Sequence, residues 1–260
     1  MNIYYTSIKG RRDENEDRHN IILNIDGKNK DVLPINLFGV YDGHGGSYVS
    51  DFLEKNIPIF YCNPKLKIPF TKKYHEEVFD ILQKKILENP NGFTHGSTCL
   101  LAIIHYCKNE LCLNVANVGD SRLIVINKDG KTKQITTDHS PEDPKEIKRI
   151  TDLGGDIYTD VDGTKRIGEL SVSKSFGDED NAPYISHKPD VFNIKLANIQ
   201  YVVMFCDGLY ASLNNEDIIK IINISKKKKS KNLAVDLVEE SLKQGTTDNV
   251  SLIVIELELD

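Results

Sequence analysis

The sequence lacks the features that would place the protein in a membrane or on nucleic acid. No apolar stretch approaches the roughly 20 residues that a membrane-spanning helix requires. The start, Met1-Asn2-Ile3, has no apolar core of a signal peptide, and Asn2 stands where N-myristoylation requires glycine, so we expect neither. Lys and Arg (33) are outnumbered by Asp and Glu (39), which gives a net charge of −6. Non-specific nucleic-acid binding relies on a basic surface, so we expect no nucleic-acid partner. Without a spanning stretch or a lipid anchor, we also expect no membrane partner.

Cysteine is scarce and shows no pairing pattern. The count is odd and no two cysteines have CxxC spacing. Two of them lie in apolar runs, where a cysteine usually serves as a small buried side chain. We therefore expect a protein with reduced thiols, in the cytoplasm or the nucleus. The five cysteines are Cys62, Cys99, Cys107, Cys112 and Cys206, of which Cys99 and Cys206 lie in the apolar runs.

The chain has no internal repeat and no Pro/Ser-rich linker, and its 260 residues suit one large domain or two small ones. Short turns between Val/Ile-rich runs favour antiparallel sheets, and helical patterns between groups of strands favour helical outer layers, which makes the class α+β. We predict strands at 20–25, 35–41, 98–105, 110–118, 123–127, 201–206 and 250–257. We predict helices at 47–56, 72–88, 143 to about 154, 214–222 and 232–243, the third of them capped by Asp143 before Pro144.

The one biased segment is the basic run at 225–231, which includes Lys226–Lys231. It falls between the last two predicted helices, so a solvated loop is the first interpretation. A nuclear-import or docking patch is the alternative.

The most informative segment is Asp42-Gly43-His44-Gly45-Gly46, directly after the apolar run at 37–41. The run predicts a buried strand, and the glycines turn the backbone sharply at its end. A carboxylate, a bare backbone carbonyl and an imidazole are thereby placed together at a strand tip. These groups can hold a hard metal ion beside an acid or base, although Asp-Gly is also a common turn pair.

Other acids stand where strands begin or end. Glu16 and Asp17 precede the first predicted strand, Asp120 and Asp207 follow two others, and Asp248 precedes the last. Each could be an ordinary turn residue, but together they predict convergence at one sheet edge. Two carboxylates ~4 Å apart repel by about 4 kcal/mol at an effective dielectric constant near 20, so such a cluster requires cations. Oxygen ligands without paired Cys or His favour Mg²⁺ or Mn²⁺ over Zn²⁺; Ca²⁺ remains possible by chemistry, without an EF-hand pattern.

These motifs, in this order along nearly the whole chain, resemble the metal-dependent Ser/Thr protein phosphatases of type 2C. The similarity runs from about Tyr4 to Leu257 and implies one catalytic domain over residues 1–260. The implied fold is a four-layer αββα sandwich, in which two antiparallel sheets are flanked by helices. The matching segments are Arg12…Glu16-Asp17, Asp42–Gly46, Gly96–Thr98, Gly119–Arg122, Asp138-His139, Gly168–Asp178, Asp207–Leu209 and Asp248-Asn249.

The resemblance also implies roles for the site residues around two Mn²⁺ or Mg²⁺ ions. Asp42 would bridge both ions, Asp207 and Asp248 would hold one, and Glu16 with the carbonyl of Gly43 would hold the other. Asp17 would bind water held by a metal, and Arg12 would bind the substrate phosphate through its planar guanidinium. In some relatives an Asp at the position of Asp120 helps to hold a weaker third ion.

Three positions depart from the family pattern. Ala211 stands where some relatives have a second Asp for the third ion, so a possible third ion stays open. Tyr210 replaces a common Trp and is interpreted as a packing substitution. Ser173-Lys174 replaces a common Ser-Arg pair, which predicts a weaker fixed contact at that point.

The resemblance predicts hydrolysis of phosphoserine and phosphothreonine monoesters in phosphoproteins by a monomeric enzyme. Two metals can convert a bridging water to hydroxide and screen the phosphoryl charge, while a lone acid or base contributes only about 10²–10⁴-fold. His44 is the candidate acid for the leaving group; its alternative role is to orient a metal-bound water. Two other functions are weighed: a catalytically silent relative that binds phosphoproteins, and another two-metal hydrolase such as a phosphodiesterase or nuclease. The substrate-specifying segment is predicted within residues 138–190.

Overall fold

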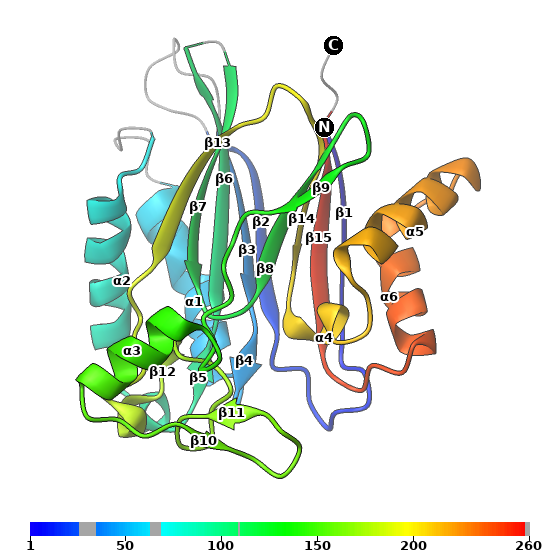
Figure 1. Cartoon of the computed structure of the whole chain (residues 1–260). Coiled ribbons are helices and arrows are strands. Elements are labelled where there is room, and N and C mark those ends of the chain that lie inside the picture. Colours follow the sequence, from blue (N-terminus) through cyan, green and yellow to red (C-terminus); the bar gives the residue numbers. More distant parts are fainter. Residues whose placement is uncertain (26–34, 63–68, 109, 258–260) are drawn as a thin grey trace.

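The computed structural model describes residues 1–25, 35–62, 69–108 and 110–257. Two five-stranded sheets lie face to face, and each has a pair of helices on its outer side (Figure 1). This arrangement confirms the predicted α+β class and the αββα layers. Among the described residues, none of the helices combines the length and the apolar character needed to cross a bilayer.

All neighbours in both sheets pair antiparallel, as short connections require. The first sheet has the order β13-β7-β6-β3-β2, and the second has the order β1-β15-β14-β8-β9. The first sheet comprises β2 (Arg18–Ile25), β3 (Ile35–Tyr41), β6 (Cys99–Cys107), β7 (Glu110–Val118) and β13 (Asp190–Lys195). The second comprises β1 (Asn2–Ile8), β8 (Arg122–Asn127), β9 (Thr132–Gln134), β14 (Ile199–Phe205) and β15 (Val250–Glu256). Strands β1, β9 and β13, which the sequence analysis missed, lie at the sheet edges.

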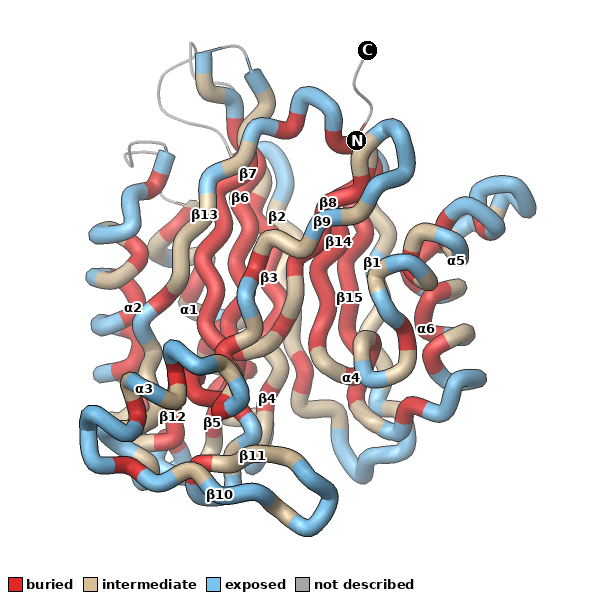
Figure 2. Tube along the Cα trace, viewed as in Figure 1, coloured by how far each residue is buried: buried red, intermediate tan, exposed pale blue. Residues whose placement is uncertain are grey.

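The central strands are mostly apolar, as expected for strands with both faces buried (Figure 2). In β3, Leu37 belongs to the core beneath the outer helices, and its neighbour Phe38 belongs to the core between the sheets. Strand β14 alternates in the same way, with Met204 between the sheets and Phe205 under the other helix pair. The result is three stacked cores, with the strand ends left free to form a site.

The outer helices are α1 (Tyr48–Tyr61) and α2 (Lys72–Ile86) on the first sheet, and α5 (Asn215–Lys227) and α6 (Leu233–Lys243) on the second. Helix α1 continues through Pro58 and ends at Tyr61, five residues beyond its predicted end at 56. Pro58 has no N–H to donate to the carbonyl of Glu54. The side-chain amide of Asn20 donates to that carbonyl instead, at 3.1 Å, so the helix is not interrupted.

The basic run was predicted to be a loop, and this prediction is wrong for its first residues. Helix α5 continues to Lys227, and the Lys226 ammonium lies 2.7 Å from a carboxylate oxygen of Glu256. Lysine is a good helix former, so the run extends the helix that precedes it.

The remaining elements lie near one end of the sandwich (Figure 1). Helix α3 (Pro144–Asp152) begins at the predicted Asp143 cap, whose side chain accepts the N–H of Lys145. The segment that follows it contains the hairpin β10 (Tyr158–Thr159) and β11 (Lys165–Arg166). The other short elements are β4 (Gly43–His44), β5 (Gly96–Ser97), β12 (Phe176–Gly177), α4 (Asp207–Tyr210) and two 3₁₀ turns, Pro90–Phe93 and Glu179–Asn181.

Candidate active site

The predicted site residues converge on one cleft at the edge of the sandwich. The cleft encloses about 420 Å³. Its walls include all but one of the predicted residues, and the exception, Asp17, is buried with only 2% of its surface exposed. The predicted residues in the wall are Arg12, Glu16, Asp42, Gly43, His44, Asp120, Asp207 and Asp248.

Asp42 is fixed by its backbone at the end of β3. Its N–H donates to the Thr98 hydroxyl oxygen at 3.0 Å, and the Thr98 N–H donates to its carbonyl at 2.9 Å. The Thr98 hydroxyl also lies 2.8 Å from that of Ser121. The carboxylate of Asp42 can therefore point into the cleft while its backbone is hydrogen bonded on both sides.

Asn249 holds the loop that carries Glu16. Its side-chain oxygen accepts the Glu16 N–H at 2.8 Å. Its side-chain NH₂ donates to the carbonyls of Lys9 and Glu14 at 2.8 and 2.9 Å. Because Asn249 follows Asp248 directly, one amide joins the N-terminal loop to another acid of the cleft. The sequence analysis included Asn249 in a motif but assigned it no role.

Gly43 must be a glycine for steric reasons. A Cβ atom at this position would lie 2.5 Å from the carbonyl oxygen of Glu16 and 2.7 Å from the hydroxyl of Ser50. The Ser50 hydroxyl donates to that same Glu16 carbonyl at 2.5 Å. The close approach brings the Glu16 loop against the Asp42-Gly43 turn and leaves the Gly43 backbone at the cleft wall.

The carboxylates raise one another's pKa. Burial, and then the neighbouring acids, raise the pKa of Asp17 and of Asp207 to about 6 and that of Asp120 to about 7. The same causes raise the pKa of Asp42 well above its usual value. Asp17 Oδ1 is buried without a hydrogen-bond partner among the described residues. The many carboxylate oxygens, including this unpaired one, are suitable ligands for hard divalent cations. The acids need the positive charge of such cations in order to be ionised together.

Cys206 belongs to the floor of this cluster. Its Sγ atom and oxygens of Asp17 and Asp42 all lie within 4.8 Å of one another. Burial, followed by the charges of these acids, raises the pKa of the thiol well above its usual value, so it remains protonated. The S–H donates to Asp17 at 3.3 Å, and the sulfur accepts the N–H of Ser251 at 3.1 Å. Cys206 is buried as predicted, but it also orients a site carboxylate.

Arg12, the predicted phosphate ligand, pairs with an acid of the cleft. Its Nη2 lies 2.6 Å from Asp248 Oδ2, and 60% of its side chain is exposed. A second guanidinium, that of Arg166 on β11, also lines the cleft. It is held by Asp160 and by the carbonyl of Glu169, each at 2.9 Å. The sequence analysis did not single out Arg166.

His44 has a buried anionic partner that the sequence analysis did not identify. Its Nε2 lies 2.8 Å from Oδ2 of Asp178, which also accepts a short hydrogen bond from the Ser175 hydroxyl. Burial lowers the pKa of His44, but the hydrogen bond and charge of Asp178 outweigh burial, so the pKa is raised. The ring is thereby held in one orientation and kept able to donate a proton from Nδ1.

Tyr210 does more than pack. Its hydroxyl donates to Asp120 Oδ2 at 2.9 Å, and the guanidinium of Arg122 lies 3.5 Å from its ring centroid. Arg122 is in turn bonded to both oxygens of Asp138. The interpretation of Tyr210 as a packing substitution is therefore incomplete.

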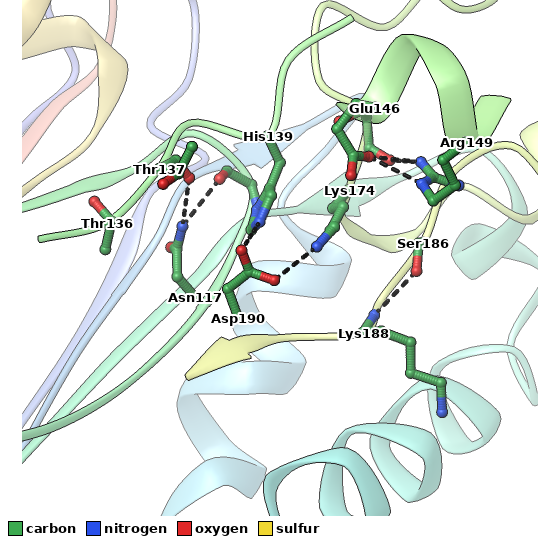
Figure 3. Close-up of polar contacts among 12 residues, drawn as sticks. Asn117, Thr136, Thr137, His139, Glu146, Arg149, Lys174, Ser186, Lys188 and Asp190 are labelled. Atoms are coloured by element: carbon green, nitrogen blue, oxygen red, sulfur yellow. Dashed lines mark hydrogen bonds and ion pairs between the residues drawn. The ribbon is translucent and has the colours of Figure 1, made fainter. Parts of the chain in front are cut away.

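Lys174 also makes a fixed contact, although the Ser-Lys pair predicted a weaker one. Its ammonium lies 3.1 Å from Asp190 Oδ1, and Asp190 Oδ2 lies 3.3 Å from Nε2 of the buried His139 (Figure 3). The other nitrogen of His139 accepts the N–H of Gly119 at 3.1 Å. This chain of contacts joins the segment that carries the β10–β11 hairpin to the turn that carries Asp120.

Comparison with known proteins shows which family the sequence matches. A family model described as Protein phosphatase 2C matches residues 2–250. The Arabidopsis thaliana protein named "Probable protein phosphatase 2C 11" is 34% identical, over 98% of this chain and 66% of its own length. The Bos taurus protein named "Protein phosphatase 1L" is 29% identical, over 98% of this chain and 72% of its own. The chain thus spans about two thirds of the length of these relatives.

A solved structure shows the same fold. The serine-threonine phosphatase 2C of Toxoplasma gondii superposes with a TM-score of 0.82 at 21% identity. The superposition covers 98% of this chain and 94% of that one.

Proposed function

The chain belongs to the protein phosphatase 2C family, and on that premise we propose that it is a protein serine/threonine phosphatase dependent on two divalent cations. The single observation that carries the proposal is the convergence of Glu16, Asp42, Asp207 and Asp248 on one cleft that also contains Arg12 and His44. Its substrates would be phosphoserine and phosphothreonine monoesters of phosphoproteins. A monomeric state and a cytoplasmic or nuclear location stay predictions.

The family resemblance implies how the acids divide between the two cations. We propose that Asp42, at the centre, contacts both cations, that Asp207 and Asp248 complete one site, and that Glu16 with the Gly43 carbonyl completes the other. Asp17 lies beneath them and would hold water next to a cation. Bound Mn²⁺ or Mg²⁺ would supply Lewis acidity and positive charge toward the phosphoryl oxygens.

Arg12 binds and orients the substrate in this proposal. Its guanidinium is already at the cleft, where Asp248 holds it at 2.6 Å. A phosphate monoester presents two coplanar oxygens to which the guanidinium can donate two parallel hydrogen bonds. Because the Arg12 side chain is mostly exposed, it can turn to the phosphate without breaking a packed core.

His44 provides the proton for the leaving group. A serine or threonine alkoxide is a poor leaving group and needs protonation as its bond to phosphorus breaks. Asp178 holds Nε2, so Nδ1 is the nitrogen that would donate to the alkoxide oxygen. The charge of Asp178 favours the protonated imidazole, which is the form this role requires.

The two alternative functions have less support. A silent binding module would not need the complete set of cleft acids together with a histidine held by a buried carboxylate. A nuclease or phosphodiesterase is disfavoured by the family assignment and by the net charge of −6.

The test is phosphate release from a phosphothreonine peptide by the wild type and by Asp207→Asn, with and without millimolar Mn²⁺. Loss of groups that merely support a metal ligand costs about 10–100-fold, so loss of a ligand itself should reduce kcat/KM by about 100-fold or more. Asp129→Asn, an exposed change on the β8–β9 turn, is the control and should leave the rate unchanged. Turnover that does not require added metal, or full activity of Asp207→Asn, would contradict the proposal.

A further inference from the structure

The single turn of α4 carries two polar residues, one that lines the cleft and one that contacts an acid of the cleft wall. Asp207 is its first residue and Tyr210 its last, and residues three apart lie on the same side of a helix. While Asp207 lines the cleft, the Tyr210 hydroxyl donates to Oδ2 of Asp120 at 2.9 Å. One of the two carboxylate oxygens of Asp120 is therefore occupied by a neutral donor from the neighbouring element.

The ring of Tyr210 is held in this position. The Arg122 guanidinium carbon lies 3.5 Å from the ring centroid, a close cation–π contact. Arg122 cannot swing away freely, because its Nε and Nη2 donate to both oxygens of Asp138 at 2.6–3.0 Å. Phe205 packs against the ring edge, with 6.4 Å between centroids. The hydroxyl is thus aimed by its surroundings and does not depend on the hydrogen bond alone.

The backbone of the turn that carries Asp120 is held as well. The ring atom Nδ1 of His139 accepts the Gly119 N–H at 3.1 Å, and the backbone N–H of His139 donates to the Gly119 carbonyl at 3.2 Å. The Asn117 side-chain amide donates to the same carbonyl at 3.2 Å. Figure 3 shows the His139 ring directed toward the Asp190 carboxylate, which lies 3.3 Å from its Nε2. With the turn fixed at Gly119 and the carboxylate fixed by Tyr210, Asp120 has little freedom to swing toward an additional cation.

We infer that Tyr210 is a positioning residue that withholds one oxygen of Asp120 from cations, so that the cleft holds two divalent ions and no third ion at Asp120. This inference rests on the proposed function only in taking the cleft to be the cation site. A hard divalent ion keeps several waters but still needs carboxylate oxygens from the protein, and with Oδ2 engaged by Tyr210, Asp120 has only Oδ1 left to offer. The next residue, Ala211, is exposed and brings no side-chain oxygen to share the task.

The test counts bound Mn²⁺ in the full chain, from the electron paramagnetic resonance signal of the free ion during titration to millimolar concentration. The matched pair is Ala211→Asp and Tyr210→Phe/Ala211→Asp, which differ only in the hydroxyl of Tyr210. We expect two ions in the wild type and in Ala211→Asp, and three in the double variant. Adding Asp120→Asn to the double variant should remove the third ion, whereas Asp120→Asn in the wild type should remove none.

Three results would overturn the inference. They are a third ion in the wild type that Asp120→Asn removes, a third ion in Ala211→Asp with Tyr210 intact, and only two ions in the double variant. Tyr210→Trp/Ala211→Asp keeps a large ring but has no hydroxyl group, so it replaces the phenylalanine variant if that protein does not melt cooperatively. The ions are counted without substrate, so this test does not depend on activity. If the ion counts are as expected but the protein releases no phosphate, the proposed function is rejected and the inference stands.

Discussion

The contact between His44 and Asp178 provides the sharpest test of the proposed proton donor. Asp178 is almost fully buried and accepts hydrogen bonds from His44 Nε2, at 2.8 Å, and from Ser175. Asp178→Asn keeps the size of the side chain and removes its charge. A hydrogen bond to a charged group contributes about 1.5–3 kcal/mol, which corresponds to about 10–150-fold in rate if it stabilises the protonated imidazole during catalysis.

The loss should depend on the leaving group. We expect kcat for a phosphothreonine peptide to fall by about 10–150-fold, and kcat for p-nitrophenyl phosphate to fall by less than about threefold, because nitrophenolate leaves without a proton. Asp180→Asn, an exposed neutralisation two residues away, is the matched control and should change neither rate. An equal loss on both substrates would refute the reasoning, since it would show that Asp178 supports the cleft in general and not the proton transfer.

Two further predictions concern stability and cation binding. Burial lowers the pKa of His75 from 6.5 to about 4. Between these pH values the unfolded chain binds more protons than the folded chain, so the contribution of His75 to stability falls as pH falls through this range. The free energy of unfolding of the wild type relative to His75→Gln should fall by about 3 kcal/mol from pH 7 to pH 4 in urea titrations; a constant difference would contradict this. Asn249→Ala releases the Glu16 loop, and the Mn²⁺ concentration for half-maximal activity should rise by about 10–100-fold; an unchanged concentration would show that the loop holds its position without Asn249.

Features encoded by adjacent residues could be predicted from the sequence. Strand β3 and the Asp42-Gly43-His44 turn were identified because an apolar run and a glycine-rich turn are local signals. Helix α3 could be placed from its Asp-Pro start for the same reason. The family resemblance then supplied the order of the layers, which the structure and the comparisons confirm.

The convergence of the acids was predicted, but individual contacts between side chains that are distant in the sequence were not. The continuation of α1 through Pro58 depends on the side-chain amide of Asn20 on β2. This amide donates to the carbonyl of Glu54, which lies 34 residues later in the chain. Asp178 lies 134 residues from His44, and Tyr210 lies 90 residues from Asp120. The sequence analysis placed Asp178 in a matching segment and noted Tyr210 as a departure, but nothing in the local sequence identifies their partners, because these contacts come from where the fold places the side chains.

The connection that Asn249 makes has a consequence for how the protein can be divided. The amide lies near the end of the chain, yet it fixes backbone groups of Lys9, Glu14 and Glu16 near the beginning. The acids of the cleft likewise come from both sheets and from both ends of the sequence. Release of the N-terminal segment up to Glu16 would therefore take an acid from the cleft but only the edge strand β1 from the sheets, whereas release of a segment that contains Asn249 would also remove the central strand β15. Limited proteolysis in the N-terminal loop would silence such an enzyme before it unfolded it.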